Sequence, residues 1–163
     1  MSDDSIKDAL NMMPYGFYSI TSRNGDDLNA MVANWISQVS FEPRMVSLAL
    51  QKTSYTHGLV EKGRVFAINI FRKEDQEIMM PFCKSRAKFP DKIAEATYTT
   101  APKTGCPILE GAAAYIEFEV AQIIDIGGDH DLVVGKPVGA EVLKQTDVED
   151  VLTLPHLGWS YAG

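Results

Sequence analysis

The sequence predicts a mainly β fold, in which an antiparallel barrel carries a few short helices at its periphery. Residues 45–51 and 112–126 alternate apolar and polar side chains, with the period of two that marks half-buried strands. The chain holds about six strand-like segments and only two or three short helical ones. These strands do not alternate with long helices, as the strands of a doubly wound parallel sheet would, so a barrel is the better interpretation.

The first third of the chain contains a helix, a strand and a tight turn. Apolar residues at helical spacing predict a helix over Ser5–Met13, which Pro14 ends. Aromatic and β-branched residues predict a strand over Tyr15–Thr21. The Asn24-Gly25 pair is a strong signal for the turn of a β-hairpin. Residues Asn29–Phe41 then predict a further strand, irregular in its pattern and interrupted by a proline at position 43.

The middle of the chain combines strands with two helices. Met45–Gln51 is predicted as a strand, and residues 54–62 as a short helix with Thr53 or Ser54 at its N-cap and Gly63 at its end. The nearly all-apolar segment Val65–Phe71 predicts a buried strand. A helix is predicted over Lys73–Cys83.

The last part of the chain is predicted to form a long hairpin. Residues Lys103–Pro107 are expected to form a loop. The strands Ala112–Ile126 and Asp131–Val142 are expected on either side of a turn at Gly127–His130.

Length and composition indicate one globular domain over residues 1–163. A chain of 163 residues is typical of a single domain, and no linker or repeat divides it. Hydrophobic residues make up 45% and charged residues 23%, which argues against disorder. The net charge of −7, with no basic stripe, disfavours nucleic acid and anionic lipid as partners.

The sequence predicts neither a metal site nor a membrane span. Cys83 and Cys106 lack the paired spacing of zinc or iron–sulfur ligands, and the three isolated histidines are not at metal-ligand spacing. No run of about 18 apolar residues occurs. The N-terminus is acidic and polar, unlike a signal peptide, so the expected location is the cytoplasm.

The first candidate for chemistry is the segment Gln51–His57, where a strand ends and a helix begins. Free backbone N–H groups and the helix dipole make such a junction suited to an anion. The side chains there include the donors that a phosphate needs: Lys52, Thr53, Ser54 and Thr56. The alternative is simple helix capping, which is favoured when the segment is taken alone.

Two further segments carry polar groups. In residues 31–43, polar side chains at Asn34, Ser37, Gln38 and Ser40 punctuate an apolar stretch that can hold a flat polar ring through backbone donors. The favoured alternative is an edge strand with a solvated face. His130 lies between two aspartates, which can hold one tautomer and let the ring titrate near neutral pH, although Asp and Gly also make turns by themselves.

Five motifs follow one another in a characteristic order. They are Asn29–Trp35 continued through Ser40–Arg44, Ser54–His57, Phe66–Ile70, Gly105–Ala112 and Gly128–His130. In this order, from about residue 14 to 161, the chain resembles the flavin reductase-like family of FMN-binding split barrels. It is most similar to the flavoredoxin and NAD(P)H:flavin oxidoreductase branch.

The resemblance implies a six-stranded antiparallel Greek-key split barrel with peripheral short helices. It also implies a homodimer with an FMN site near each end of the subunit interface. By the same resemblance, the segment contacting the isoalloxazine ring is Val32, Ala33, Asn34 and Trp35, with Ser37, Gln38 and Ser40. The phosphate-binding residues are Lys52, Thr53, Ser54 and Thr56, and Gln51 before them also binds the cofactor. A polar loop near the flavin contains Lys84, Ser85, Arg86 and Lys88. His130 lies near the nicotinamide or the reactive flavin edge.

Two departures from the family pattern affect the functional hypothesis. Hydroxyl donors that many members carry in the first motif are replaced by Met31–Asn34, so the ring contacts should rest on backbone N–H groups and Asn34. Gly135-Lys136-Pro137 stands where many members have Gly-Glu-Val, which reverses a charge near the expected nicotinamide side.

The sequence therefore supports three hypotheses. The first is an NAD(P)H-dependent FMN reductase that transfers hydride to FMN. The second, motivated by Lys136-Pro137, is a flavoredoxin-like electron carrier with tightly bound FMN and a protein electron donor or acceptor. The third is an FMN-binding module without turnover.

Overall fold

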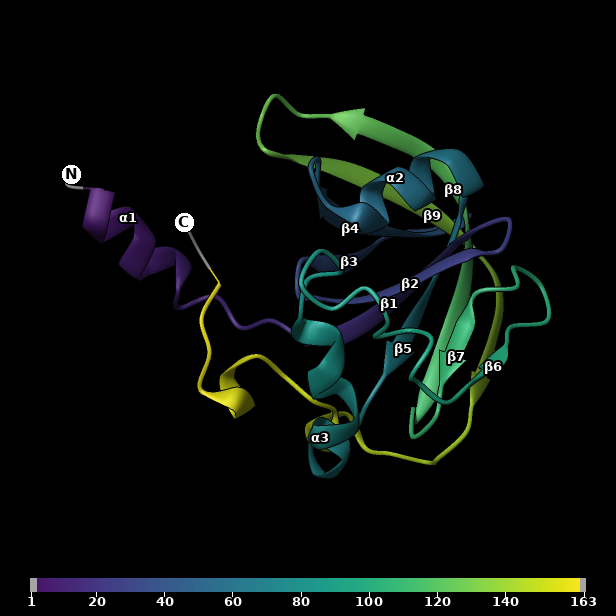
Figure 1. The fold of residues 1–163 in the computed structure, drawn as a ribbon. Coiled ribbons are helices and arrows are strands. Elements are labelled where there is room, and N and C mark those ends of the chain that lie inside the picture. Colours follow the sequence, from purple (N-terminus) through teal and green to yellow (C-terminus); the bar gives the residue numbers. More distant parts are fainter. Residues whose placement is uncertain (1–2, 162–163) are drawn as a thin grey trace.

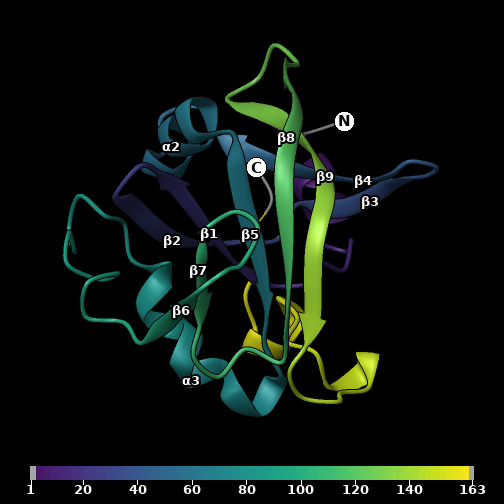
Figure 2. The ribbon, with the colours of Figure 1, turned by 90° about the vertical axis from the view of Figure 1, so that its right-hand side faces the viewer.

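A computed structural model of the chain describes residues 3–161 and confirms the mainly β, antiparallel fold (Figures 1 and 2). Seven strands form one sheet and two short strands form a second. The strands are β1 (Tyr18–Asn24), β2 (Asp27–Ala33), β3 (Ile36–Phe41), β4 (Arg44–Gln51), β5 (Val65–Ile70), β6 (Tyr98–Thr100), β7 (Pro107–Leu109), β8 (Ala114–Asp125) and β9 (His130–Val142). The α-helices are α1 (Asp3–Leu10), α2 (Tyr55–Gly63) and α3 (Gln76–Met79). Short 3₁₀ helices span Lys73–Asp75, Met80–Cys83, Val148–Asp150 and Pro155–Leu157.

The strand order of the large sheet is β2-β1-β5-β8-β9-β4-β3. The two edge strands, β2 and β3, are separated in the chain only by Asn34 and Trp35. The chain therefore passes directly from one edge of the sheet to the other, which requires the sheet to curl into a barrel. The backbone N–H of Ala49 on β4 donates to the Trp35 carbonyl at 3.0 Å and holds this crossing in place.

This crossing corrects two predictions. The single irregular strand expected over 29–41 is two strands, β2 and β3, on opposite edges of the sheet. The large sheet accordingly has seven strands instead of the six expected. The backbone leaves the β1–β2 ladder and enters the β3–β4 ladder at Asn34-Trp35. This pair, a polar residue followed by a bulky aromatic one, therefore interrupts the expected strand.

Other boundaries also differ from the expectation. β1 begins at Tyr18, because the residues before it pair instead with the C-terminal segment: Phe17 N–H donates to the Leu152 carbonyl at 3.2 Å. The helix expected over 73–83 is divided into α3 and two 3₁₀ turns. The strands β6 and β7 had no counterpart in the prediction, and the expected loop ends where Pro107 begins β7. The hairpin β8–β9 and the helix α2 lie within two residues of their predicted positions.

The barrel interior is a cluster of buried apolar side chains from six strands and α2. Phe66 on β5 stacks against Phe118 on β8 with ring centroids 4.7 Å apart, and both side chains are fully buried. A second cluster lies outside the sheet, around Phe71 and Met79, where α3 and the C-terminal segment cover one end of the barrel. In Figure 1, α1 extends away from the barrel on the side where the described chain also ends. Within residues 3–161, no helix combines the length and the apolar character needed to cross a membrane.

Asn69 on β5 joins the two sheets through buried hydrogen bonds. Its Oδ1 accepts from the Leu109 N–H on β7 at 2.9 Å, and its Nδ2 donates to Thr21 Oγ1 at 3.3 Å. Thr21 Oγ1 in turn donates to the Pro107 carbonyl at 2.7 Å. Polar groups buried to this extent are stable only when they are paired, so Asn69 fixes the small sheet against the barrel.

We expect Asn69→Ala to lower the free energy of unfolding by about 2–4 kcal/mol, because it leaves the Leu109 N–H buried without an acceptor. Urea unfolding followed by circular dichroism measures this change. The matched control is Gln122→Ala, which removes an exposed amide on β8 and should change the stability by no more than about 0.5 kcal/mol. Equal effects of the two substitutions would contradict the role assigned to Asn69.

Candidate functional site

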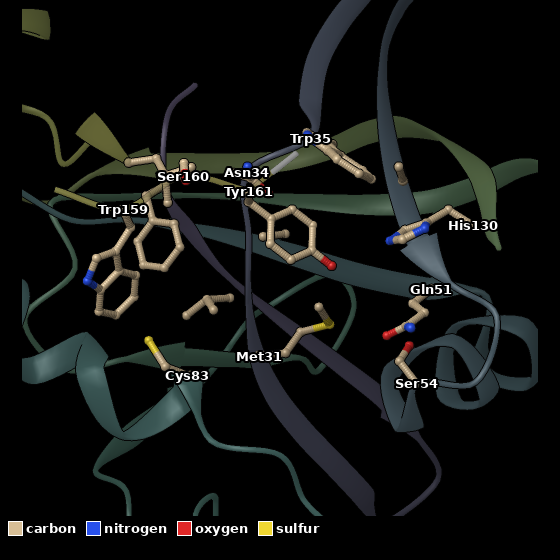
Figure 3. Close-up of a pocket in the computed structure, with 15 residues that line it drawn as sticks. Met31, Asn34, Trp35, Gln51, Ser54, Cys83, His130, Trp159, Ser160 and Tyr161 are labelled. Carbon is tan, nitrogen blue, oxygen red and sulfur yellow. The ribbon is translucent and has the colours of Figure 1, made fainter. Parts of the chain in front are cut away.

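A cavity of about 300 Å³ lies where β2 ends, between the start of β9 and the C-terminal segment (Figure 3). Its floor is largely apolar and its rim carries a few polar side chains, which is the usual character of a small-molecule site. Its lining consists of Phe17, Met31, Val32, Ala33, Asn34, Trp35, Ala49, Gln51, Ser54, Cys83, His130, Leu154, Trp159, Ser160 and Tyr161. We refer to it as the ring cavity.

The antiparallel pairing of β4 with β9 positions the polar rim of the ring cavity. In this register Gln51 lies opposite His130 and Leu50 lies opposite Asp131. Asp131 accepts a hydrogen bond from His57 Nε2 at 2.7 Å, which ties α2 to the beginning of β9. A strand, a helix and a second strand thus converge beside His130.

His130 lies in the ring cavity with one of its nitrogens already committed. Its Nδ1 is 2.6 Å from Asp129 Oδ1, and this interaction holds the pKa of the Asp129 carboxyl below its usual value. Because an ionised carboxylate can only accept, Nδ1 carries the hydrogen and Nε2 is left for other partners. The imidazole also packs against the Trp35 indole, with ring centroids 4.9 Å apart.

Aromatic side chains of the C-terminal segment cover the ring cavity. Tyr161 packs on the face of Trp35 with ring centroids 5.1 Å apart, and Trp159 meets Phe17 edge to face at 5.8 Å. Figure 3 shows the Tyr161 ring directed into the cavity, toward the side that carries Trp35 and His130. Aromatic rings, tilted or edge to face, therefore already occupy the mouth of this cavity.

Asn34 brings an unused donor to the same cavity. The residue is only 7% exposed, and its Nδ2 has no hydrogen-bond partner among the described residues. A buried amide without a partner is costly, which is why such groups are uncommon outside functional sites. A planar heterocycle with carbonyl acceptors would satisfy this donor.

A second cavity, of about 760 Å³, continues from the first along β2. The two share the lining residues Met31, Val32, Gln51, Ser54 and Cys83, so they form one groove. The remaining lining of the second cavity is Asn29, Thr53, Tyr55, Thr56, Phe82, Lys84, Ser85, Arg86, Ala87, Pro90 and Lys92. Three of these residues are cationic and none is Asp or Glu. We call this part the basic end of the groove.

The N-terminus of α2 opens onto the basic end. Ser54 is the N-cap, and its Oγ accepts from the His57 N–H at 3.1 Å. The buried Thr56 Oγ1 accepts from Asn29 Nδ2 at 3.0 Å. Both hydroxyls therefore contribute to the fold as acceptors, and each keeps its own hydrogen to donate to an anion. Phosphate binding and helix capping, the two interpretations of this segment, are compatible in this geometry.

Five of the candidate residues lie outside the groove: Lys52, Ser37, Gln38, Ser40 and Lys88. Lys52 Nζ donates to Asp125 Oδ1 at 2.8 Å, and this bond raises the pKa of the lysine. Its charge is therefore directed to the β8–β9 turn and not to the groove. Ser37, Gln38 and Ser40 lie on the edge strand β3 and line neither cavity of the described chain.

The remaining candidates lie along the groove. Val32, Ala33, Asn34, Trp35, Gln51 and His130 line the ring cavity. Thr53, Ser54, Thr56, Lys84, Ser85 and Arg86 line the basic end. The Arg86 guanidinium lies 4.1 Å from the Tyr55 ring centroid and 3.2 Å from Asp27 Oδ1, so a carboxylate partly neutralises its charge.

Sequence reasoning missed the cover of the ring cavity and one cation. The sequence predicted no role for Trp159, Ser160 and Tyr161, although clustered aromatics after the last strand are a usable signal. Lys92 lies in a turn-rich segment with no pattern to distinguish it. It is only 7% exposed, and no Asp or Glu of the described chain forms an ion pair with it.

Neither cysteine shows an activated thiol. Burial raises the pKa of Cys83, and it raises that of Cys106 to about 11. Among residues 3–161, no three His, Cys, Asp or Glu side chains come together in a group able to hold a metal ion.

Comparisons with known proteins show which family and which solved structures this chain is similar to. A family model for the flavin reductase like domain matches residues 10–157. Diflavin flavoprotein A 1 of Synechocystis sp. is 33% identical over 143 residues, which are 87% of this chain and 25% of that protein. The high molecular weight rubredoxin of Moorella thermoacetica is 30% identical over 84% of this chain and 60% of its own length. The chain thus spans a quarter and three fifths of these relatives.

Among solved structures, the chain is similar to an FMN-binding protein from Thermus thermophilus with bound 1-cyclohex-2-enone. The TM-score is 0.73 at 26% sequence identity, over 82% of this chain and 73% of that one.

The burial of Lys92 leads to a prediction about stability. Burial, and to a smaller extent the charge of Arg86, lower the pKa of Lys92 from 10.5 to about 8. Below pH 8 the ammonium is charged in both the folded and the unfolded chain. The cost of burying this charge therefore lowers the free energy of unfolding at every pH below 8. Between pH 8 and 10.5 the unfolded chain binds more protons, so the stability rises with pH.

We therefore expect Lys92→Met to raise the free energy of unfolding at pH 7 by about 1–3 kcal/mol, after allowing for one lost hydrogen bond. The advantage of the variant over the wild type should shrink between pH 8 and 10.5. Urea unfolding at several pH values measures both effects. If Lys92→Met were less stable than the wild type at pH 7, the predicted cost of burying the Lys92 ammonium would be wrong.

Proposed function

This chain belongs to the flavin reductase-like family, and we propose that it binds FMN along the groove and transfers hydride from NAD(P)H to the flavin. One observation carries the proposal. A largely apolar cavity with an unpartnered amide donor runs without interruption into an end that carries three cations and no carboxylate. FMN has the matching polarity, with a planar ring at one end and a phosphate dianion at the other.

The chain offers a partner for each part of FMN. Val32, Ala33 and Asn34, at the end of β2, would hold the isoalloxazine ring, with Asn34 Nδ2 donating to a ring acceptor. Ser54 and the N-terminus of α2 would hold the phosphate, since free N–H groups and the helix dipole both favour an anion. The thiol of Cys83, held neutral by its raised pKa, adds no competing negative charge in the groove.

When bound, the flavin supplies the redox chemistry, and the protein contributes binding, orientation and exclusion of water. His130 lines the ring cavity while Asp129 holds its Nδ1, so the imidazole is fixed in one orientation. Its Nε2 would be suited to accepting a hydrogen bond from the carboxamide N–H of a nicotinamide. Trp35 provides a flat surface beside it.

The direct experiment combines a flavin titration with a turnover assay. Tryptophan fluorescence should be quenched on adding FMN, because Trp35 and Trp159 line the cavity. Oxidation of NADH or NADPH should then exceed the free-flavin background. Absence of any flavin binding would remove the proposal, and binding without turnover would leave the electron-carrier function described below.

We expect His130→Ala to raise the KM for NAD(P)H by roughly 10-fold, since it removes one hydrogen bond and a stacking surface. The Kd for FMN should change by less than about threefold, because His130 lies at the rim and not at the basic end. Steady-state kinetics with saturating FMN measures the first quantity and fluorescence titration the second. His156→Ala, a histidine that lines neither cavity, is the control and should leave both values unchanged.

A second candidate function is electron transfer through tightly bound FMN, without direct use of a nicotinamide. The observation that favours it is the cover formed by Trp159–Tyr161, because the Tyr161 ring packs at a tilt against Trp35, where a second planar ring would have to approach. Relatives named as a diflavin flavoprotein and as a rubredoxin agree with a role in electron transfer.

Removal of the Tyr161 ring distinguishes the two functions. If the chain is a carrier whose cover excludes nicotinamides, Tyr161→Ala should increase NADH oxidation by about 10-fold or more, a barrier change of roughly 1.4 kcal/mol. If the chain is a reductase in which Tyr161 helps to hold the nicotinamide, the same change should lower kcat/KM. Tyr98→Ala, away from the groove, is the control.

We also propose that the chain forms a single domain over residues 1–163 and acts in the cytoplasm as a homodimer. The position of Ser37, Gln38 and Ser40 on an exposed edge strand motivates the homodimer. Since these side chains line neither cavity of their own protomer, they would reach a flavin only across a subunit interface.

A further inference from the structure

Residues 84–91 form a mostly exposed loop that lies between two cavities, and we call this loop the strap. In Figure 2 it belongs to the loop at the left of the view, between α3 and β6. Part of the strap lines the basic end of the groove. Part of it lines a third cavity, of about 870 Å³, whose other lining includes Ile78 and Leu109. Lys84 and Pro90 line both cavities, so the strap is a thin wall with free volume on each side.

The backbone of the strap is attached only to its own stretch of chain. Among the described residues, the backbone hydrogen bonds of residues 84–91 are all made within residues 81–95. The Lys84 carbonyl also accepts from Lys92 Nζ at 2.8 Å, and the Lys84 ammonium lies 4.3 Å from the Phe89 ring centroid. A segment with exposed side chains and few hydrogen bonds to other elements can open locally at a small free-energy cost.

Arg86 is the exception, because it joins the strap to two other elements that line the basic end. Its Nη2 lies 3.2 Å from Asp27 Oδ1, and its Nη1 donates to the Leu28 carbonyl, both at the start of β2. Its guanidinium carbon lies 4.1 Å from the centroid of the Tyr55 ring, at the start of α2. The Tyr55 hydroxyl donates to Asp27 Oδ2, so the three side chains form one cluster.

The strength of this cluster is suited to a reversible contact. The Arg86 and Asp27 side chains are 23% and 39% exposed, and ion pairs that water reaches contribute little to stability. Asp27 lines neither cavity of the groove and does not line the third cavity. It can therefore influence a ligand in the groove only through the strap and the residues that it holds.

We propose that the strap is a lid over the basic end of the groove, that Arg86, Asp27 and Tyr55 form its latch, and that the third cavity receives the strap when it opens. The inference rests on the function proposed above and concerns how FMN enters and leaves. Lids of this kind often set the rate at which a ligand is exchanged. The stability of the latch then determines whether FMN is retained as a cofactor or released as a product.

The test measures the rates of FMN binding and release in Asp27→Asn, which weakens the latch without changing the lining of the groove. Because a lid must open for entry and for exit, we expect kon and koff both to rise about three- to tenfold, as for the loss of a partly exposed charged contact. The Kd should stay within about twofold. Stopped-flow quenching of tryptophan fluorescence at several FMN concentrations measures both rates.

Asp26→Asn is the matched control, because it removes the same charge from the exposed neighbouring residue and should leave both rates unchanged. The proposal is overturned if Asp27→Asn does not raise kon. A rise in koff alone would mean that the cluster holds the flavin by direct contact and gates nothing.

Limited digestion with trypsin tests the latch without flavin, since Lys84, Arg86 and Lys88 place three cleavage sites on the strap. Cleavage of a locally opened segment follows the population of its open form. Asp27→Asn should speed cleavage at these sites about three- to tenfold over the wild type and Asp26→Asn, as identified by mass spectrometry. Sites outside the strap should keep their wild-type rates.

The digestion also separates failure of this proposal from failure of the proposed function. If the wild type bound no flavin, the proposed function would be wrong, and the cleavage pattern would still show whether Asp27 holds the strap closed. Unchanged cleavage of the strap in Asp27→Asn, or an equal increase at every site in the chain, would overturn the latch.

Discussion

The antiparallel pairing of β4 with β9 is the constraint on which the candidate site depends. It sets Gln51 opposite His130, and it places Asp131 where His57 of α2 can donate to it at 2.7 Å. Because side chains alternate along a strand, a slip of one residue would turn His130 to the other face of the sheet. Separately from this pairing, β4 is held to Trp35 by the backbone bond from the Ala49 N–H to the Trp35 carbonyl. One ladder thus aligns the ring cavity, its histidine and the helix that opens onto the basic end.

The distribution of charge would allow an acidic chain to bind an anion at one end of the groove. The net charge is −7, yet the basic end of the groove is lined by Lys84, Arg86 and Lys92 and by no carboxylate. A local field of this kind acts at short range, because water and salt screen the more distant acidic surface. The cost of burying Lys92 is the kind of local conflict that proteins keep at functional sites, where a ligand relieves it.

The aromatic cover connects the two functional alternatives. Trp159 packs on Phe17, and Tyr161 packs against Trp35, so aromatic side chains cover one side of the ring cavity. Shielding suits an electron carrier, which must protect a reduced cofactor from side reactions. A reductase needs the same surface to open or to take part in holding the nicotinamide. The two functions therefore differ in whether the C-terminal segment keeps the nicotinamide out of the groove or helps to hold it there.

Local pattern alone determined the strands β4, β8 and β9 and the helix α2, because alternation, capping and turn residues act between neighbours in the chain. The order of the five motifs along the chain indicated the family. The last of these motifs, Gly128–His130, contains His130. Only the tertiary structure decided that the segment 29–41 divides at Asn34-Trp35 between opposite edges of the sheet. It also decided that Lys52 pairs with Asp125 while Lys92 is buried at the groove. Partners of this kind meet through closure of the barrel, across more than 70 residues for Lys52 and Asp125, and no sequence period records such a contact.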